Sequence, residues 1–175
     1  MTTAAAGSTT QQRLQQARRA APHVAELSSA QKNRILRDLA VALETQEEAI
    51  VSANQLDLQA SGIEGAFRDR LLLTPERVAT MTQGIRAIAE LPDPIGDVLE
   101  EWTRPNGLVI RKVRVPLGVV GIIYESRPNV TIDTLCLALK SCNAIVLRGG
   151  REAAHSNQRL VEIAQRIPGM PEGAV

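Results

Sequence analysis

The stretch that decides the fold is VPLGVVGIIYESRPNVTIDTLCLALKSCNAIVLRGGR, residues 115–151. It contains two apolar runs, 119–123 and 144–147, which predict short buried strands. Between them lies a helical pattern whose apolar face consists of Ile132, Leu135, Cys136 and Leu139. Asn143 is expected to end this helix in the left-handed conformation. Strand, helix and strand in this order predict a right-handed βαβ unit with parallel strands.

Two polar loops follow the strands, YESRPN at 124–129 and RGGRE at 148–152. Ligands of open parallel sheets bind at the carboxyl ends of the strands, so both loops are candidate site loops. Arg127 can grip an acyl phosphate or a carboxylate through paired hydrogen bonds. Asn129 can donate to a developing oxyanion, and its alternative role is to cap the following helix. Pro128, between them, stiffens the loop.

The second loop has the composition of a nucleotide contact. Arg148 suits a 2′-phosphate, and Gly149 and Gly150 let the backbone approach a ligand closely. A simple turn is the alternative, because no G-x-G-x-x-G fingerprint follows a strand. Ser126, Glu152 and Asn157 complete the set of candidate cofactor contacts.

The residues before this unit predict helices and then a hairpin. A first helix is expected over 10–21, stopped by Pro22. Capping boxes at Ser28 and Thr45 and the Thr74-Pro75 pair predict three more helix starts. These helices are expected to cover one face of the parallel sheet through Leu39, Ile50 and Ile85. Asn106-Gly107 between the runs 98–103 and 108–115 predicts a β-hairpin.

The predicted organisation has four parts and an α/β fold. Residues 1–27 form a tail and a first helix, and 28–97 form the helical part of a cofactor-binding domain. Residues 98–115 form a hairpin arm. Residues 116–175 form an incomplete, Rossmann-like nucleotide-binding part that ends at Ala174-Val175, the expected first step of a third strand. The arm's basic residues indicate either a solvated face or a surface that pairs with another subunit.

Composition excludes several classes of function. The net charge is +1 and only Phe67, Trp102 and Tyr124 are aromatic, so no nucleic-acid surface is indicated. No stretch has the roughly 20 apolar residues of a membrane span. Cys136 and Cys142 have no metal-ligand spacing and are predicted to be unpaired, which suits the cytoplasm. Neither is a good nucleophile, and His23 and His155 are expected at the surface.

The stretch PLGVVGIIYESRPNVTIDTLCLALKSCNAIVLRGG resembles the gamma-glutamyl phosphate reductases of the aldehyde dehydrogenase superfamily. ANQLDL at 53–58, DRLLLT at 69–74 and LPDPIGDV at 91–98 extend the resemblance over nearly the whole chain. It implies an aldehyde dehydrogenase-like fold, of which this chain is the truncated N-terminal part. The domain that carries the catalytic cysteine is expected to be absent.

The resemblance also implies a function. Members reduce L-glutamyl 5-phosphate with NADPH to L-glutamate 5-semialdehyde and phosphate, in proline biosynthesis, through a thioester on a cysteine. It implies NADP(H) contact at Arg148, an oxyanion role for Asn129, and a homo-oligomer formed through the 98–115 hairpin. The alternative is a noncatalytic nucleotide-binding or oligomerisation module from a truncated paralogue. No metal, nucleic acid or membrane partner is expected.

Overall fold

The computed structural model describes residues 9–175, so the predicted tail at 1–8 lies outside the described residues. Five helices come first: α1 Thr10–Ala25, α2 Ser29–Thr45, α3 Glu47–Ser61, α4 Gly65–Leu71 and α5 Pro75–Glu90. Strands β1 Val98–Thr103 and β2 Val109–Val113 follow. The last elements are β3 Val119–Ile123, α6 Pro128–Lys140, β4 Ala144–Arg148, a 3-10 turn η1 Arg151–Ala153 and α7 Ala154–Gln165.

The predicted βαβ unit is confirmed. Strands β3 and β4 pair in parallel, with Val119 opposite Ala144 and Ile123 opposite Arg148. Helix α6 connects them and buries the predicted face, including Ile132 and Leu135. A backbone hydrogen bond from Ile145 N–H to Ala174 O at 2.8 Å places the chain beside the other edge of β4. Ala174 therefore lies where a third strand was expected, although no strand is formed there.

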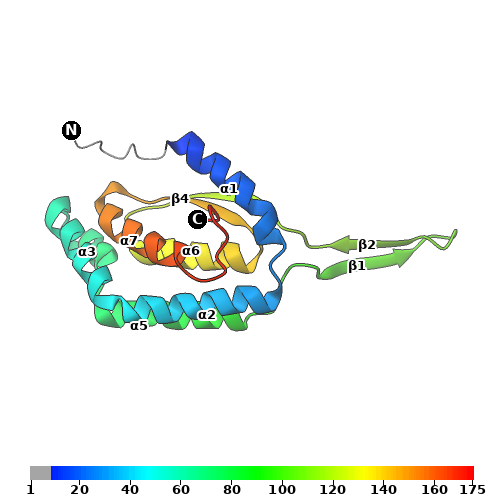
Figure 1. The fold of residues 1–175 in the computed structure, drawn as a ribbon, viewed down its shortest axis with the longest axis horizontal. Helices are drawn as coiled ribbons and strands as arrows, with labels where there is room; N and C mark the ends of the chain where they lie inside the picture. The colour runs from blue at the N-terminus through cyan, green and yellow to red at the C-terminus, as the bar shows by residue number, and fades with distance from the viewer. Residues whose placement is uncertain (1–8) are drawn as a thin grey trace.

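The layers differ from the prediction in one respect. Helix α1 lies against β4 on one side of the strand pair, and α6 and α7 lie on the other side (Figure 1). Helices α2 and α5 pack on α6 rather than on the strands. Leu39, Ile50 and Ile85 are buried, but they fill the helix layers instead of covering the sheet. The expectation that these residues cover the sheet is wrong, because α6 packs on β4 and the helices that carry them pack on α6 and α7.

Three local predictions about helix ends are also wrong. Pro22 does not stop α1, which continues to Ala25 because Val24, fully buried, holds the last turn against the core. Thr45 does not start a helix: its hydroxyl donates to Val41 O within α2. Asn143 does not take the left-handed conformation. Cys142 does, at φ +57°.

Asn143 is used differently at the end of α6. Its N–H donates to Ala138 O and the Cys142 N–H donates to Leu139 O, which together form a Schellman motif. Its side-chain oxygen accepts from Gly118 N–H at 2.9 Å and so ties the start of β3 to the end of α6. The side chain is therefore committed to Gly118, and the left-handed residue is the one before it.

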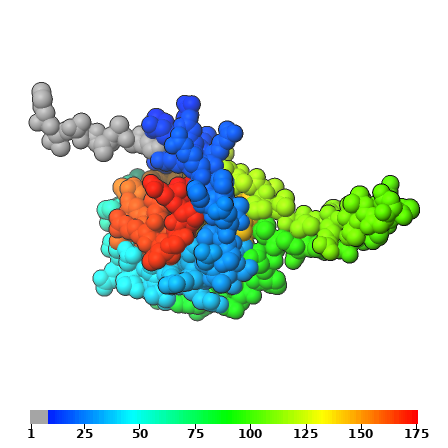
Figure 2. Space-filling model, turned by 45° about the vertical axis from the view of Figure 1, so that its right-hand side comes forward, coloured from blue at the N-terminus to red at the C-terminus, as the bar shows by residue number. Residues whose placement is uncertain are grey.

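The hairpin is confirmed and projects from the body as an arm (Figures 1 and 2). Its turn is closed by hydrogen bonds from Gly107 N–H to Arg104 O and from Arg104 N–H to Leu108 O, with Gly107 at φ +85°. Both strands are exposed along nearly their whole length. Three ion pairs tie the arm's charged residues together, Arg111 with Glu101, Lys112 with Glu100 and Arg114 with Asp97.

Candidate functional site

The two predicted site loops meet at the carboxyl edge of β3 and β4. The Tyr124 N–H donates to Arg148 O at 3.1 Å, which extends the strand pairing by one step. The Ser126 hydroxyl donates to Glu152 Oε2 at 2.5 Å and joins the loops directly. This hydrogen bond lowers the pKa of the Glu152 carboxyl. Four of the predicted cofactor contacts, Ser126, Arg148, Gly150 and Glu152, therefore lie close together.

Gly149 and Gly150 are required by close packing. A Cβ on Gly149 would lie 2.3 Å from Asn157 Nδ2 and 3.1 Å from the Tyr124 ring. A Cβ on Gly150 would lie 2.0 Å from Ser126 Oγ. The glycine backbone thus admits neighbouring side chains of the protein itself. These close contacts require both glycines whether the loop binds a ligand or forms a simple turn.

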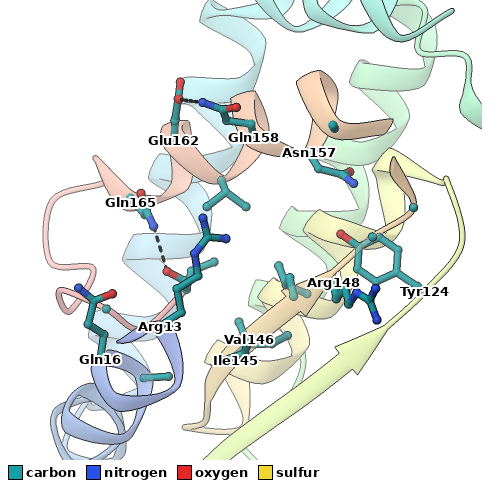
Figure 3. A pocket seen from close by; sticks show the side chains of 18 of the residues that line it. Arg13, Gln16, Tyr124, Ile145, Val146, Arg148, Asn157, Gln158, Glu162 and Gln165 are labelled. Atoms are coloured by element: carbon teal, nitrogen blue, oxygen red, sulfur yellow. Dashed lines mark hydrogen bonds between the residues drawn. The ribbon is translucent and has the colours of Figure 1, made fainter. Parts of the chain in front are cut away.

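A cavity of about 720 Å³ runs along β4 to the RGGRE loop (Figure 3). Its walls come from α1, β4, the loop and α7. Three arginines, Arg13, Arg148 and Arg151, and one carboxylate, Glu162, line it. Cationic side chains in excess of anionic ones favour an anionic ligand such as a nucleotide.

Arg148 is the best placed of these cations for a ligand. It is exposed at the end of β4, and within residues 9–175 its guanidinium makes no hydrogen bond or ion pair. Glu162 is less available, since it accepts from Gln158 Nε2 at 2.9 Å and lies 3.7 Å from Arg159. The donor set at this rim therefore fits the phosphate groups of a nucleotide.

Arg127 and Asn129 lie at the start of α6. Arg127 is the N-cap residue, and its Nε lies 2.6 Å from Glu125 Oε1 in an ion pair. Asn129 lies within the first turn, and its Nδ2 donates to Asp133 Oδ2 at 3.3 Å. The alternative that Asn129 caps α6 is wrong, because Arg127 occupies the cap position. Burial raises the pKa of the Asp133 carboxyl.

Both cysteines are free, as predicted, and both are buried. Burial raises the pKa of the Cys136 thiol far above its ordinary value, which makes it inert. Cys142 Sγ lies 3.1 Å from Nζ of the buried Lys32. His23 and His155 are exposed, as predicted. In the described part of the chain no three His, Cys, Asp or Glu side chains are arranged to hold a metal ion, and no helix there is long and apolar enough to cross a membrane.

Two hydrogen-bonded polar groups near the loops were not predicted from the sequence, although Asn157 itself was a candidate cofactor contact. Asn54 Nδ2 and Asp57 Oδ2 on α3 both bond to Ser156 in the first turn of α7. Tyr124, Thr131 and Asn157 form a second group beside Gly149. Burial raises the pKa of Tyr124, so its hydroxyl stays a hydrogen-bond donor. The sequence did contain a sign of the first group. Asn54 and Asp57, three apart in ANQLDL, lie on the same buried face of a helix.

Comparisons of the sequence and of the structure with known proteins agree on one family. The aldehyde dehydrogenase family model matches residues 2–175. The chain is 63% identical over 167 residues to the gamma-glutamyl phosphate reductase of Koribacter versatilis, covering 95% of this chain and 41% of that protein. The crystal structure of gamma-glutamyl phosphate reductase from Thermotoga maritima superimposes with a TM-score of 0.89 at 37% identity, covering 94% of this chain and 41% of that one.

A more distant structure, PnpE in complex with nicotinamide adenine dinucleotide, shares the fold with a TM-score of 0.73 at 23% identity, covering 94% of this chain and 32% of that one. The chain spans about 40% of the length of the curated relatives it matches.

Proposed function

The chain belongs to the aldehyde dehydrogenase family, and on that premise we propose that it forms the N-terminal, cofactor-binding part of a gamma-glutamyl phosphate reductase. The proposed reaction is the reduction of L-glutamyl 5-phosphate by NADPH to L-glutamate 5-semialdehyde and phosphate, in proline biosynthesis in the cytoplasm. The observation that carries the proposal is the 63% identity, over 95% of this chain, to a protein of that name. The activity is proposed for the whole protein to which these residues belong.

The cofactor role is assigned to the rim of the cavity. Arg148 would contact the 2′-phosphate of NADPH, since it is exposed and makes no ion pair within residues 9–175. Gly149 and Gly150 would leave room at the rim for neighbouring side chains to pack against the backbone. The hydrogen bond between Ser126 and Glu152 would hold the two loops together. When bound, the cofactor supplies the hydride. The 28–97 helices and the 116–175 unit are thus proposed as one cofactor-binding part, with the 98–115 arm separate.

The substrate role is assigned to the start of α6. Arg127 is proposed to bind the phosphate or a carboxylate of the substrate. Its Nε lies close to Glu125 in an ion pair but makes no hydrogen bond, and its terminal nitrogens meet no acceptor in the described part of the chain. The Asn129 amide is proposed to donate to the oxyanion, with Asp133 holding one of its two N–H groups. Neither buried cysteine is proposed as the nucleophile.

Titration of the protein with NADPH and NADH tests the cofactor assignment. The wild type should bind NADPH more tightly, and Arg148→Ala should weaken NADPH by about 1.5–3 kcal/mol while changing NADH little. Arg166→Ala, an exposed arginine outside the cavity, is the control. Equal losses for both cofactors would remove Arg148 from the 2′-phosphate. Binding without turnover of glutamyl phosphate by the whole protein would favour the noncatalytic module instead.

A further inference from the structure

Three side chains beside the RGGRE loop form a chain of hydrogen bonds with a defined direction. The Thr131 hydroxyl donates to Asn157 Oδ1 at 2.8 Å and lies 2.6 Å from Tyr124 Oη. A hydroxyl has one hydrogen, and that of Thr131 is used on Asn157. Tyr124 must therefore be the donor to Thr131. Thr131 is fully buried, so water does not compete for these bonds.

The Asn157 amide is turned with its oxygen toward Thr131. Its oxygen accepts from Thr131, so its nitrogen faces away from Thr131. Nδ2 lies over Gly149, since a Cβ there would be 2.3 Å from it. Asn157, Tyr124 and Gly149 all line the cavity, and Figure 3 shows the Asn157 side chain directed from α7 toward the end of β4. Within residues 9–175, Nδ2 donates to no protein acceptor.

We propose that Asn157 donates a hydrogen bond from Nδ2 to an oxygen of the bound nucleotide, a ribose hydroxyl or a phosphate. Thr131 and Tyr124 are positioning residues that keep the amide nitrogen turned toward the cavity. The inference rests on the proposed cofactor function. It adds a neutral hydrogen-bond donor, Asn157 Nδ2, to the site beside the cationic Arg148. It also explains Gly149, because any larger residue would occupy the place of the amide nitrogen.

Gln158 provides a matched control. It is the next residue of α7, has the same functional group and lines the same cavity. One of its two amide N–H groups is used, because Nε2 donates to Glu162 Oε1 at 2.9 Å, and this holds the amide beside a carboxylate. Truncation of Gln158 therefore removes a cavity-lining amide whose neighbouring carboxylate, Glu162, repels the phosphates of a nucleotide.

The experiment measures the dissociation constant of NADPH by fluorescence titration of the whole protein and its variants. Asn157→Ala should weaken binding about three- to tenfold, the value of one neutral hydrogen bond. Asn157→Asp should weaken it about tenfold or more, because a carboxylate has no N–H to donate and repels phosphate. Asn157→Asp keeps the side-chain shape and the acceptor for Thr131. Its NADPH dissociation constant therefore tests the inference even if the alanine variant folds poorly. Gln158→Ala should bind as the wild type does.

Thr131→Val tests the positioning role, since it leaves Asn157 in place and removes the bond that turns it. Its NADPH affinity should fall toward that of Asn157→Ala, and in the Asn157→Ala background the same change should cost nothing further. Titrations with adenosine 2′,5′-bisphosphate and with nicotinamide mononucleotide identify which half of the cofactor loses affinity in Asn157→Ala. If the wild type binds NADPH and both Asn157 variants bind it equally well, the inference is overturned and the cofactor assignment stands. A wild type that binds no NADPH overturns both.

Discussion

The Asp57 carboxylate accepts two hydrogen bonds from Ser156, one from the backbone N–H at 2.8 Å and one from the hydroxyl at 2.6 Å. Its other oxygen accepts from the His155 N–H at 3.0 Å. Asp57 is only 3% exposed. It thus satisfies backbone N–H groups that the first turn of a helix leaves free, at the end where negative charge is favoured. The start of α7 is therefore occupied by a protein carboxylate and is not free to bind a phosphate.

Replacing Asp57 should therefore destabilise the protein. Asp57→Ala leaves buried donors of Ser156 and His155 unpaired, and we expect a loss of about 2–4 kcal/mol in the free energy of unfolding. Asp57→Asn keeps one acceptor and should lose less. Urea unfolding measures both. Glu48→Gln, on the exposed side of the same helix α3, is the control. A midpoint for Asp57→Ala equal to that of the control would show that the bonds contribute nothing.

Asn129→Ala should affect catalysis more than stability. If the amide stabilises an oxyanion, the variant of the whole enzyme should lose about 10²–10³ in kcat with a smaller change in KM. Its unfolding midpoint should stay close to that of the wild type, because Asn129 is exposed and its one side-chain bond is to Asp133. Steady-state kinetics and thermal melting measure the two effects. An unchanged kcat would remove Asn129 from the oxyanion role.

The sequence predicted the elements whose pattern is local. The run 119–123, the helix face with Ile132 and Leu135, and the Asn-Gly turn each formed the expected structure. The juxtaposition of the two site loops also followed, because parallel strands bring their carboxyl ends to one edge.

What the sequence did not predict depends on tertiary contacts. Pro22 is accommodated within α1 because burial of Val24 offsets the lost backbone bond. The short helix α4 has no apolar periodicity of its own, and of its seven residues Leu71 alone is buried. The packing of Asn157 and Ser126 against Gly149 and Gly150 was also not predicted. Those two side chains come from α7 and from the loop after β3, so local sequence around the glycines carries no sign of them.

We expect the hairpin arm, residues 98–115, to mediate contacts between subunits of a homo-oligomer. Trp102 is 43% exposed on the arm, among the exposed apolar side chains Val98, Leu99, Leu108, Val109 and Val113. Trp102→Glu should therefore reduce the assembly to smaller species in sedimentation velocity, while the body stays folded by circular dichroism. Phe67→Glu is the matched control, an exposed aromatic residue on α4 and outside the arm. Equal sedimentation of the two variants would exclude Trp102 from the contact.

Cys142 is the one non-glycine residue with a positive φ, +57°, in the part of the chain that the structure describes. Its thiol is buried against Lys32, so removal of the side chain should cost stability whichever residue replaces it. Cys142→Gly and Cys142→Ala both lose that contact. Alanine is strained in the left-handed conformation, whereas glycine is not. The glycine variant should thus be more stable than the alanine variant by about 1 kcal/mol in urea unfolding.

Cys136, equally buried but inside α6, provides the opposite case. There alanine should be more stable than glycine by about 1 kcal/mol, because glycine is the poorer helix former. The same order of stability at both sites would contradict the left-handed conformation of Cys142, since the reversal depends on backbone geometry alone.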